Sequence, residues 1–293
     1  MINYSFIIPH KNTPKLLERC INSIPNRKDI QIIIVDDNSE EGNNKFDFIL
    51  NNSEKSIEIY LTEENRGAGY ARNFGIAKAK GTWLIFSDSD DTFVTDNLDK
   101  AMTEFLSSTN DVIYFDANCL EEGTFKALPN LNRQYKKYLY SNISRDDKCR
   151  YNIRVPWGKF IKRELVEKYT IRCDETKVCN DLLFSTKVGY YAKEISIYHY
   201  PIYNWMVQKN SLTSSKSKDS VMTHFMGGVR RNLFLEEKKI FKYRKSLFIN
   251  IPSLHKNAGY SYWGALKLIL KYIPLRFILR DIFKFIEFTL NRI

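Results

Sequence analysis

Short apolar runs alternate with helical patterns over the first hundred residues of the chain. Four runs have the length of buried strands, and they cover residues 4–8, 30–35, 57–61 and 83–86. Apolar residues recur at helical spacing in residues 14–24, 46–50 and 70–80, and a further helix is expected from Asp96. Thr13 and Pro14 fit the N-cap and first turn of the first helix. Strands that alternate with helices predict an α/β domain around a parallel sheet.

The polar clusters of this region follow directly after the apolar runs. They are Pro9-His10-Lys11-Asn12, Asp36-Asp37-Asn38-Ser39, the stretch from Glu63 to Gly69, and Asp88-Ser89-Asp90-Asp91. Ligands of parallel α/β sheets bind outside the carboxyl ends of the strands, which is where these clusters are expected.

The last cluster places three carboxylates within four residues at the end of a buried strand. Such carboxylates repel one another and lose hydration, so a cation is expected to compensate them. Mg²⁺ or Mn²⁺ that holds a phosphorylated ligand meets this need, because both ions take carboxylate and phosphate oxygens. The alternative is a solvated acidic turn that leads into a helix.

The four clusters, in their order and spacing, resemble the motifs of family 2 glycosyltransferases with the GT-A fold. The resemblance covers residues 4–93 and includes Asn65-Arg66-Gly67 with Ala71-Arg72-Asn73. It continues at Pro156-Trp157-Gly158-Lys159-Phe160 and at Asn180-Asp181-Leu182-Leu183-Phe184, and it ends near residue 215. It implies a mostly parallel sheet flanked by helices and an inverting transferase of the bacterial surface-polysaccharide type.

For the donor, the resemblance implies a UDP-sugar bound by residues 1–95. Asp37 is expected to accept the uracil imide N–H, since an ionised carboxylate is acceptor-only, and backbone around Pro9 flanks the base. Arg72 is expected to face the diphosphate, because its donors match phosphate oxygens. The remaining expected contacts to the nucleotide-sugar are Asn65, Gly67, Asp88 and Ser89.

Asp88 and Asp90 correspond to the Asp-x-Asp element of the family, so both are expected at the Mg²⁺ or Mn²⁺ ion. Asp91 is expected to cap a helix or to support the ligands from behind. Gly67 and Gly69 either let the backbone approach the ligand closely or belong to an ordinary loop.

For the acceptor, the resemblance points to residues 96–215, the second half of the same domain. Asp181 is the expected base that takes the proton from the acceptor hydroxyl. The family usually has a Glu before this Asp, and Asn180 stands there instead. The alternative is that Asp181 caps the apolar helix 182–188. Trp157 is expected either to stack on the acceptor sugar or to fill the core.

A second departure from the family lies in residues 203–213. Many relatives carry a basic residue near the diphosphate here, whereas this chain has Met206 and Val207, with Lys209 as the nearest substitute. His199 and His224 lack metal-ligand spacing and are expected to be structural or surface residues.

The charge of the chain changes at the Ser/Lys stretch 211–220. Residues 1–215 contain 29 Lys/Arg and 29 Asp/Glu, whereas residues 216–293 contain 16 and 5, which accounts for the whole net charge of +11. Residues 263–293 combine basic residues with an apolar, aromatic face that Pro274 interrupts. This region is expected to lie on an anionic membrane, or to pack on the catalytic domain or on a second subunit. No nucleic-acid motif accompanies the charge, so nucleic acid is not an expected partner.

The five cysteines are scattered and form no Cys-x-x-Cys pair, which indicates neither a disulfide framework nor a zinc site. The first strand begins at the N-terminus, without a signal-like segment, and no apolar run approaches the roughly 18–20 residues of a spanning helix. The expected location is therefore the cytoplasm, at the inner face of the cell membrane.

These observations predict a metal-dependent hexosyl- or N-acetylhexosaminyltransferase that acts on a hydroxyl of a lipid-linked glycan. One alternative is a sugar nucleotidyltransferase, which would be expected to carry a basic, Gly-rich loop after the first strand. The other is a non-catalytic relative that serves as a binding subunit, against which the carboxylates at 37, 88, 90 and 181 argue.

Overall fold

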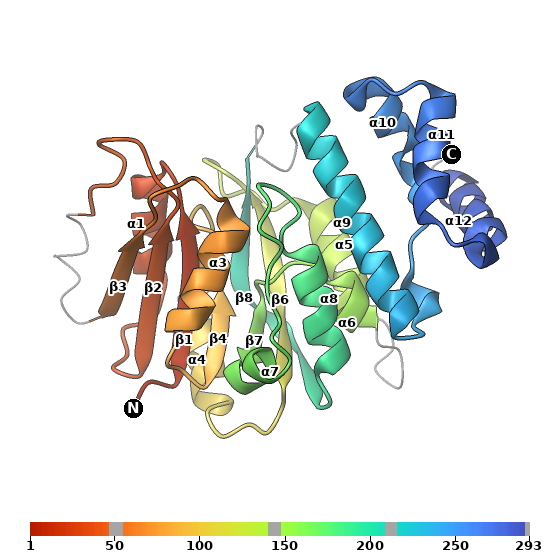
Figure 1. The fold of residues 1–293 in the computed structure, drawn as a ribbon. Coiled ribbons are helices and arrows are strands. Elements are labelled where there is room, and N and C mark those ends of the chain that lie inside the picture. Colours follow the sequence, from red (N-terminus) through yellow and green to blue (C-terminus); the bar gives the residue numbers. More distant parts are fainter. Residues whose placement is uncertain (47–54, 140–147, 209–215, 291–293) are drawn as a thin grey trace. The chain divides into compact units, whose positions relative to one another are not determined.

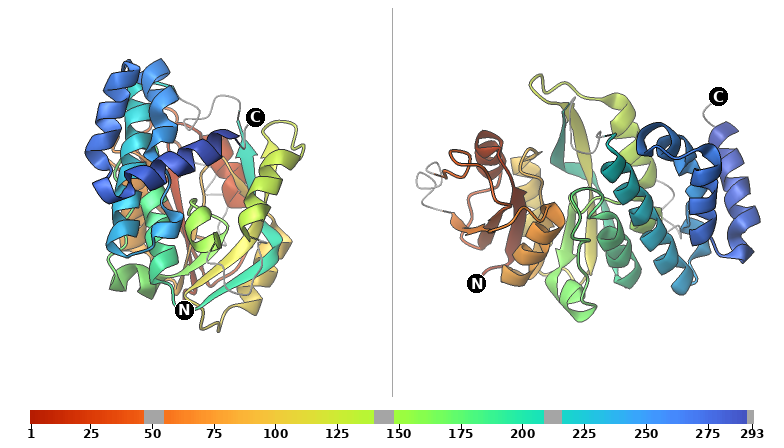
Figure 2. Two further views of the ribbon diagram at one scale, coloured as in Figure 1. Left: turned by 90° about the vertical axis from the view of Figure 1, so that its right-hand side faces the viewer. Right: turned by 45° about the horizontal axis from the view of Figure 1, so that its top comes forward.

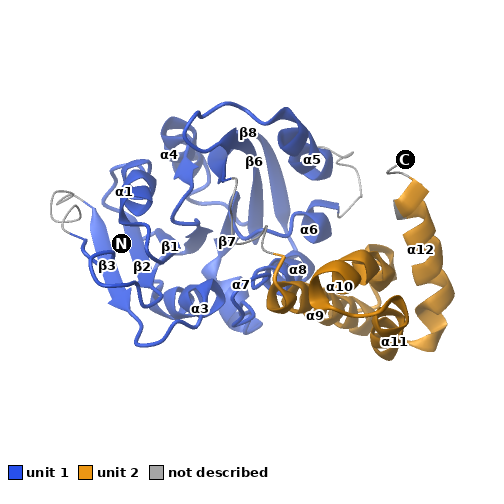
Figure 3. Ribbon diagram, turned by 90° about the horizontal axis from the view of Figure 1, so that it is seen from above, with its two compact units in different colours: residues 1–209 blue, residues 210–293 orange. Residues whose placement is uncertain are grey.

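A computed structural model of the chain describes residues 1–46, 55–139, 148–208 and 216–290. These residues form two compact units, Met1–Lys209 and Asn210–Ile293, which Figure 3 colours separately. The helix expected at residues 46–50 lies, except for Phe46, outside the described residues.

The first unit is built on an eight-stranded sheet in the described residues, with the order β3-β2-β1-β4-β7-β6-β8-β5 (Figure 1). The strands are β1 (Tyr4–His10), β2 (Ile30–Asp36), β3 (Ser56–Leu61), β4 (Trp83–Phe86), β5 (Thr92–Phe93), β6 (Val112–Glu121), β7 (Lys159–Lys162) and β8 (Ile195–Val207). β1 to β4 pair in parallel, as do β6 and β8, whereas β5 and β7 are antiparallel to their neighbours. The predicted class, a mostly parallel α/β sheet flanked by helices, is therefore confirmed.

Helices cover both faces of this sheet (Figures 2 and 3). They are α1 (Pro14–Asn22), α3 (Ala68–Lys78), α4 (Thr95–Glu104), α5 (Pro129–Leu139), α6 (Lys148–Asn152), α7 (Arg163–Lys168) and α8 (Leu182–Tyr191). Alternate side chains of β1 reach opposite layers: Phe6 shares one core cluster with Leu17 of α1, and Ile7 shares the other with Ile76 of α3. Because both faces are covered, β1 and β2 are buried along their whole length.

β1 and β2 each extend past the apolar runs that predicted them, to His10 and Asp36. The His10 Nδ1 atom lies 2.6 Å from Asp36 Oδ1, and the Thr13 N–H donates to His10 Nε2 at 3.1 Å. This pairing satisfies buried polar groups that would otherwise be costly. Thr13 stands at the predicted N-cap of α1, but its side chain makes no capping hydrogen bond.

The second unit is helical in its described residues. Its elements are α9 (Lys218–Glu237), η2 (Phe241–Tyr243), η3 (Leu247–Asn250), α10 (Ile251–Ala258), α11 (Tyr262–Tyr272), η4 (Leu275–Phe277) and α12 (Ile278–Leu290). Ala265 and Ile269 of α11 are fully buried in a core that includes Phe225 of α9 and Leu254 of α10. The apolar side of α11 therefore packs within its own unit. None of the described helices is both long enough and apolar enough to cross a membrane.

Candidate active site

The carboxyl ends of β1, β2 and β4 meet at one edge of the sheet, where the polar clusters follow them. Asp37, just after β2, is 4% exposed and accepts the N–H groups of Arg66 and Gly67, each at 2.9 Å. Its carboxylate thereby fixes the loop between β3 and α3. Each carboxylate oxygen can accept more than one hydrogen bond, so Asp37 keeps the capacity to accept an imide N–H.

Gly67 and Gly69 stand at the N-terminus of α3, against residues 174–180. Gly67 has φ +87°, a conformation that favours glycine. A Cβ on Gly69 would lie 1.9 Å from the carbonyl oxygen of Asp174 and 2.9 Å from Cβ of Asn180. The close approach that Gly69 permits is therefore to another segment of the protein, and it brings residue 180 beside α3.

Arg72 of α3 joins the two halves of the predicted site. The residue is 5% exposed; one terminal N–H group donates to Asn180 Oδ1 at 2.5 Å, and the other forms an ion pair with Asp88. Asn180, which replaces the family's usual Glu, thus acts as a neutral acceptor for Arg72. One buried guanidinium holds the Asp-x-Asp element and the segment of Asp181 together.

Asp90 lies between two polar partners. Arg19 of α1 donates to its backbone carbonyl at 2.6 Å, and Gln208 Nε2 lies 3.1 Å from Asp90 Oδ2. Desolvation, reinforced by the charge of Asp88, raises the pKa of Asp90 to about 6. A cation at this carboxylate would remove both penalties.

Asp91 has a structural environment. It is 1% exposed, and it accepts hydrogen bonds from the Tyr203 hydroxyl at 2.6 Å and from the Met206 N–H at 2.7 Å. Burial, followed by the charges of Asp88 and Asp90, raises the pKa of Asp91 well above its ordinary value. Through these two hydrogen bonds, Asp91 connects the acidic turn to β8.

Asp181 occupies the N-cap position of α8, yet its side chain makes no capping hydrogen bond. Desolvation raises the pKa of its carboxyl, against the opposing charge of Arg72, although part of the residue is open to solvent. A carboxylate with a raised pKa is a better proton acceptor than an ordinary one. The geometry leaves this carboxylate available for chemistry.

Trp157 is 4% exposed and lies between two aromatic rings. Its ring stacks on Tyr203 at 4.9 Å and on Tyr135 at 5.5 Å between centroids. In this arrangement Trp157 fills the core. Stacking of an acceptor sugar on Trp157 stays a prediction, and it would require one of the neighbouring rings to move.

The other predicted residues lie along the same edge. Pro9 is buried in β1, opposite Val35, whereas Asn65 is exposed in the loop before α3. Ser89 Oγ lies 3.4 Å from the Thr13 hydroxyl. Met206 is buried and Val207 ends β8, while Lys209 lies outside the described residues.

Sequence reasoning missed three residues that organise this edge: Tyr203, Arg19 and Gln208. Tyr203 also accepts the N–H of Asp88 at 3.0 Å, so its hydroxyl contacts two residues of the acidic turn. Arg19 additionally binds both carboxylate oxygens of Glu122 at 2.7 and 2.9 Å. These contacts join positions far apart in sequence, and no local pattern could have indicated them.

Among the described residues, no group of three or more His, Cys, Asp and Glu side chains is arranged to hold a metal ion. Asp88 and Asp90 supply two carboxylates, which fits Mg²⁺ or Mn²⁺ because such ions are commonly bound through one or two carboxylates plus substrate phosphates. A cavity of about 660 Å³ lies away from these residues, lined among others by Thr82, Asp111 and Lys162 at the amino edge of the sheet. The carboxylates, and not that cavity, mark the candidate site.

Comparisons with known proteins agree with this geometry. The sequence profile described as glycosyl transferase family 2 matches residues 5–170. The chain is 26% identical over 255 residues to the cholesterol galactosyltransferase of Borreliella burgdorferi, covering 81% of this chain and 71% of that protein. It is 26% identical over 274 residues to the GalNAc(5)-diNAcBac-PP-undecaprenol beta-1,3-glucosyltransferase of Campylobacter jejuni, covering 89% and 82%.

Solved structures with a similar fold include S. aureus TarS, with a TM-score of 0.66 at 19% identity. The alignment covers 94% of this chain and 50% of TarS. A TarS structure in complex with UDP-GlcNAc has a TM-score of 0.62 at 17% identity, covering 94% and 73%. Since the family profile spans more than half of the sequence, this chain belongs to glycosyltransferase family 2.

Proposed function

We propose that this glycosyltransferase moves a hexose or N-acetylhexosamine from a UDP-sugar to a hydroxyl of a glycan, with inversion at the anomeric carbon. The observation that carries the proposal is the position of Arg72 between Asp88 and Asn180. The buried guanidinium of Arg72 joins Asp88, the carboxylate on the donor side, to the segment that bears Asp181. Donor and acceptor groups thus share one edge of the sheet.

On the donor side, Asp37 has the acceptor oxygens that a uracil imide N–H requires. Arg72 carries the donors that suit a diphosphate, and it is already oriented by its two partners. Support for a uridine nucleotide comes from the similar fold of TarS, which has been solved with UDP and with UDP-GlcNAc. The alternative of a sugar nucleotidyltransferase lacks such support.

Asp88 and Asp90 would hold Mg²⁺ or Mn²⁺, which when bound neutralises the negative charge of the departing diphosphate. The mannosyltransferase PcManGT from Pyrobaculum calidifontis has a similar fold, with a TM-score of 0.59, and its structure has been solved with GDP-Man and Mn²⁺. In the free protein, Asp90 is desolvated beside the charge of Asp88, which raises its pKa and favours a cation at this carboxylate.

On the acceptor side, Asp181 takes the proton of the attacking hydroxyl as its oxygen bonds to the anomeric carbon. The bond from that carbon to the diphosphate breaks, and UDP leaves with the electron pair. A single displacement of this kind inverts the configuration. A positioned base contributes on the order of 10²–10⁴-fold to such a step.

The acceptor class follows from the relatives and from the charge of the second unit. Two relatives are named for lipid acceptors, cholesterol and an undecaprenol-linked glycan. We place the reaction at the inner face of a bacterial membrane, on a lipid-linked glycan of a surface polysaccharide. The net charge of +11 carried by residues 216–293 suits an anionic membrane surface.

The test is UDP release by the full chain with UDP-glucose, UDP-galactose, UDP-GlcNAc and UDP-GalNAc, each with polyprenyl-diphosphate-linked oligosaccharide acceptors. We expect acceptor-dependent release with one donor, loss of release in excess EDTA, and a product of inverted anomeric configuration by NMR. A GDP-sugar is the matched negative donor. Tight UDP binding without release for any acceptor would favour a non-catalytic relative instead.

A further inference from the structure

The helix α12 presents an apolar stripe on its outer side. Leu279, Phe283 and Leu290 are 72%, 70% and 65% exposed. The stripe recurs at spacings of three or four residues, so it follows one face of the helix, and its members are Leu279, Ile282, Phe283, Ile286 and Leu290. Leu275 of the preceding η4 is exposed as well. A soluble helix normally turns such a face toward its own core, and α12 exposes it.

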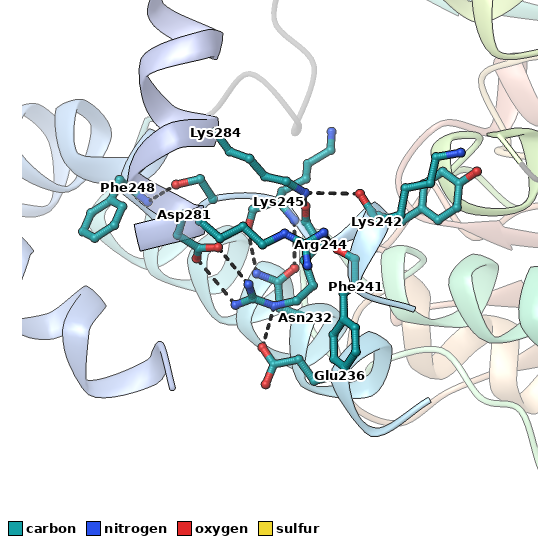
Figure 4. Close-up of polar contacts among 12 residues, drawn as sticks. Asn232, Glu236, Phe241, Lys242, Arg244, Lys245, Phe248, Asp281 and Lys284 are labelled. Carbon is teal, nitrogen blue, oxygen red and sulfur yellow. Dashed lines mark hydrogen bonds and ion pairs between the residues drawn. The ribbon is translucent and has the colours of Figure 1, made fainter. Parts of the chain in front are cut away.

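The opposite face of α12 is held by a buried polar cluster (Figure 4). Asp281 is fully buried and accepts from Arg244 at 2.8 Å, and Arg244 Nε also lies 2.6 Å from a carboxylate oxygen of Glu236. Lys284, one turn farther along α12, donates to the Arg244 carbonyl at 2.6 Å. Rotating α12 to bury its stripe would break these contacts and leave Asp281 or Arg244 as an unpaired buried charge. The cluster therefore fixes the stripe in its outward position.

The charge of the second unit as a whole restricts what can cover the stripe. Arg276 is exposed beside Leu275, and Lys267 and Lys271 are exposed on α11. The second unit carries 16 Lys/Arg and 5 Asp/Glu in all. A second copy placed on the stripe would bring two strongly cationic units together. A nucleic acid would be attracted to the basic residues, but its phosphates would not cover the apolar side chains of the stripe.

We propose that the stripe of α12 inserts into the headgroup–acyl boundary of an anionic bilayer, with the helix lying parallel to the surface. A helix of 13 residues is about 20 Å long, which is too short to cross a bilayer but suits an interfacial position. The net positive charge of the second unit favours such a surface, because its phosphate headgroups are anionic. The inference rests on the proposed function, because a lipid-linked acceptor is the reason for this transferase to bind a membrane.

The first experiment measures co-sedimentation of the full chain with phosphatidylcholine vesicles that contain 30% or no phosphatidylglycerol. We expect binding to the anionic vesicles that falls as salt rises, since the Debye length is about 10 Å at 0.1 M salt. The double variant Leu279→Asn with Phe283→Asn should lower the partition coefficient at least tenfold. The matched control is Leu106→Asn with Leu233→Asn, which changes two exposed leucines outside the stripe and should bind as the wild type does.

A second experiment reports the depth of the stripe directly. Because the four native tryptophans also fluoresce, quenching by brominated acyl chains is compared with the wild type. Phe283→Trp should add a quenched component, whereas Leu233→Trp should add one that is not quenched. Equal quenching at the two positions, or equal binding by the stripe variant and its control, would overturn the proposal. So would a dimer in the absence of lipid that the stripe variant converts to monomer, because the occupant would then be a second copy.

The two proposals fail separately. UDP release with a soluble acceptor in the absence of vesicles tests the transferase alone, and the stripe variant should retain it. If the wild type releases UDP but does not bind vesicles, only the membrane inference is rejected. Vesicle binding without UDP release would reject the proposed function only.

Discussion

The hydroxyl of Tyr203 donates a hydrogen bond to Asp91 at 2.6 Å and accepts one from the N–H of Asp88 at 3.0 Å. A residue of β8 thereby determines the shape of a turn more than a hundred residues earlier. Because Asp91 is buried beside two further carboxylates, it depends on its donors to remain in place. Tyr203 thus belongs to the framework that positions Asp88 and Asp90.

Tyr203→Phe should destabilise the protein by about 1–3 kcal/mol, because it leaves the buried Asp91 with one donor fewer and the half-buried N–H of Asp88 without its acceptor. Turnover should fall with it, since the acidic turn loses its support. Urea unfolding and UDP release measure the two effects. Tyr60→Phe is the control, as the Tyr60 hydroxyl bonds Glu58 near the protein surface; its effect should stay within about 0.5 kcal/mol. Equal effects of the two variants would contradict this role of Tyr203.

The raised pKa of Asp90, about 6, predicts how metal binding depends on pH. A metal requires the ionised carboxylate, so Mn²⁺ affinity should fall as the pH drops through 6. In the metal-free protein, the contribution of Asp90 to the free energy of unfolding has the opposite dependence on pH. The protonated form favours the fold, and this contribution is lost as the pH rises from the ordinary Asp value toward 6.

Thermal unfolding with and without Mn²⁺ from pH 5 to 8 checks both statements. The Mn²⁺-induced rise in Tm should be present at pH 7.5 and should largely vanish at pH 5. Asp90→Asn should abolish the rise and the turnover while the protein stays folded. A rise that is independent of pH, or one that survives in Asp90→Asn, would remove Asp90 from the metal site.

Asp181→Asn preserves size and removes proton acceptance, so we expect turnover to fall on the order of 10²-fold or more. UDP affinity should change little, because Asp181 contacts no expected part of the donor. Pre-steady-state UDP release and calorimetric UDP binding separate the two quantities. Glu175→Gln is the matched control, a neighbouring carboxylate that pairs with Arg66 at 2.6 Å. Loss of turnover in Glu175→Gln with activity retained in Asp181→Asn would transfer the role of base to Glu175.

The first four strands could be predicted from sequence because each is an apolar run closed by a polar cluster. The errors are at the ends, where the run stops at Ile8 or Val35 and the strand continues to His10 or Asp36. These two polar residues satisfy each other across β1 and β2. A pairing between separate strands is invisible to a local pattern.

The second half of the sheet was not predictable in the same way. β7 lies antiparallel between β4 and β6, and β6 pairs in parallel with β8. Such partners are chosen by tertiary packing and not by local periodicity. The roles of Tyr203 and of Asn180 depend on these pairings, so the sequence indicated which residues are chemically unusual without showing what holds them.

The buried cluster under α12 gives a prediction about stability. Arg244→Met should destabilise the second unit by about 3–5 kcal/mol, because Asp281 and Glu236 would remain as buried charges without their shared partner. Replacing the whole cluster, Arg244→Met with Asp281→Leu and Glu236→Leu, should recover most of this loss, since apolar side chains of similar size carry no desolvation penalty. Lys238→Met is the control, as its partner Glu237 is largely exposed, and such surface pairs contribute about 0–1 kcal/mol.

The loss in Arg244→Met should also depend on pH. Burial already raises the pKa of Asp281 against the charge of Arg244, and without Arg244 the neutral form is favoured further. Protonation at low pH removes one unpaired charge, so the deficit relative to the wild type should shrink as the solution becomes more acid. Urea titrations of both proteins at pH 5 and pH 8 measure this difference. A deficit that is equal at the two pH values, or a triple variant as unstable as Arg244→Met, would show that the cluster contributes packing and not charge pairing.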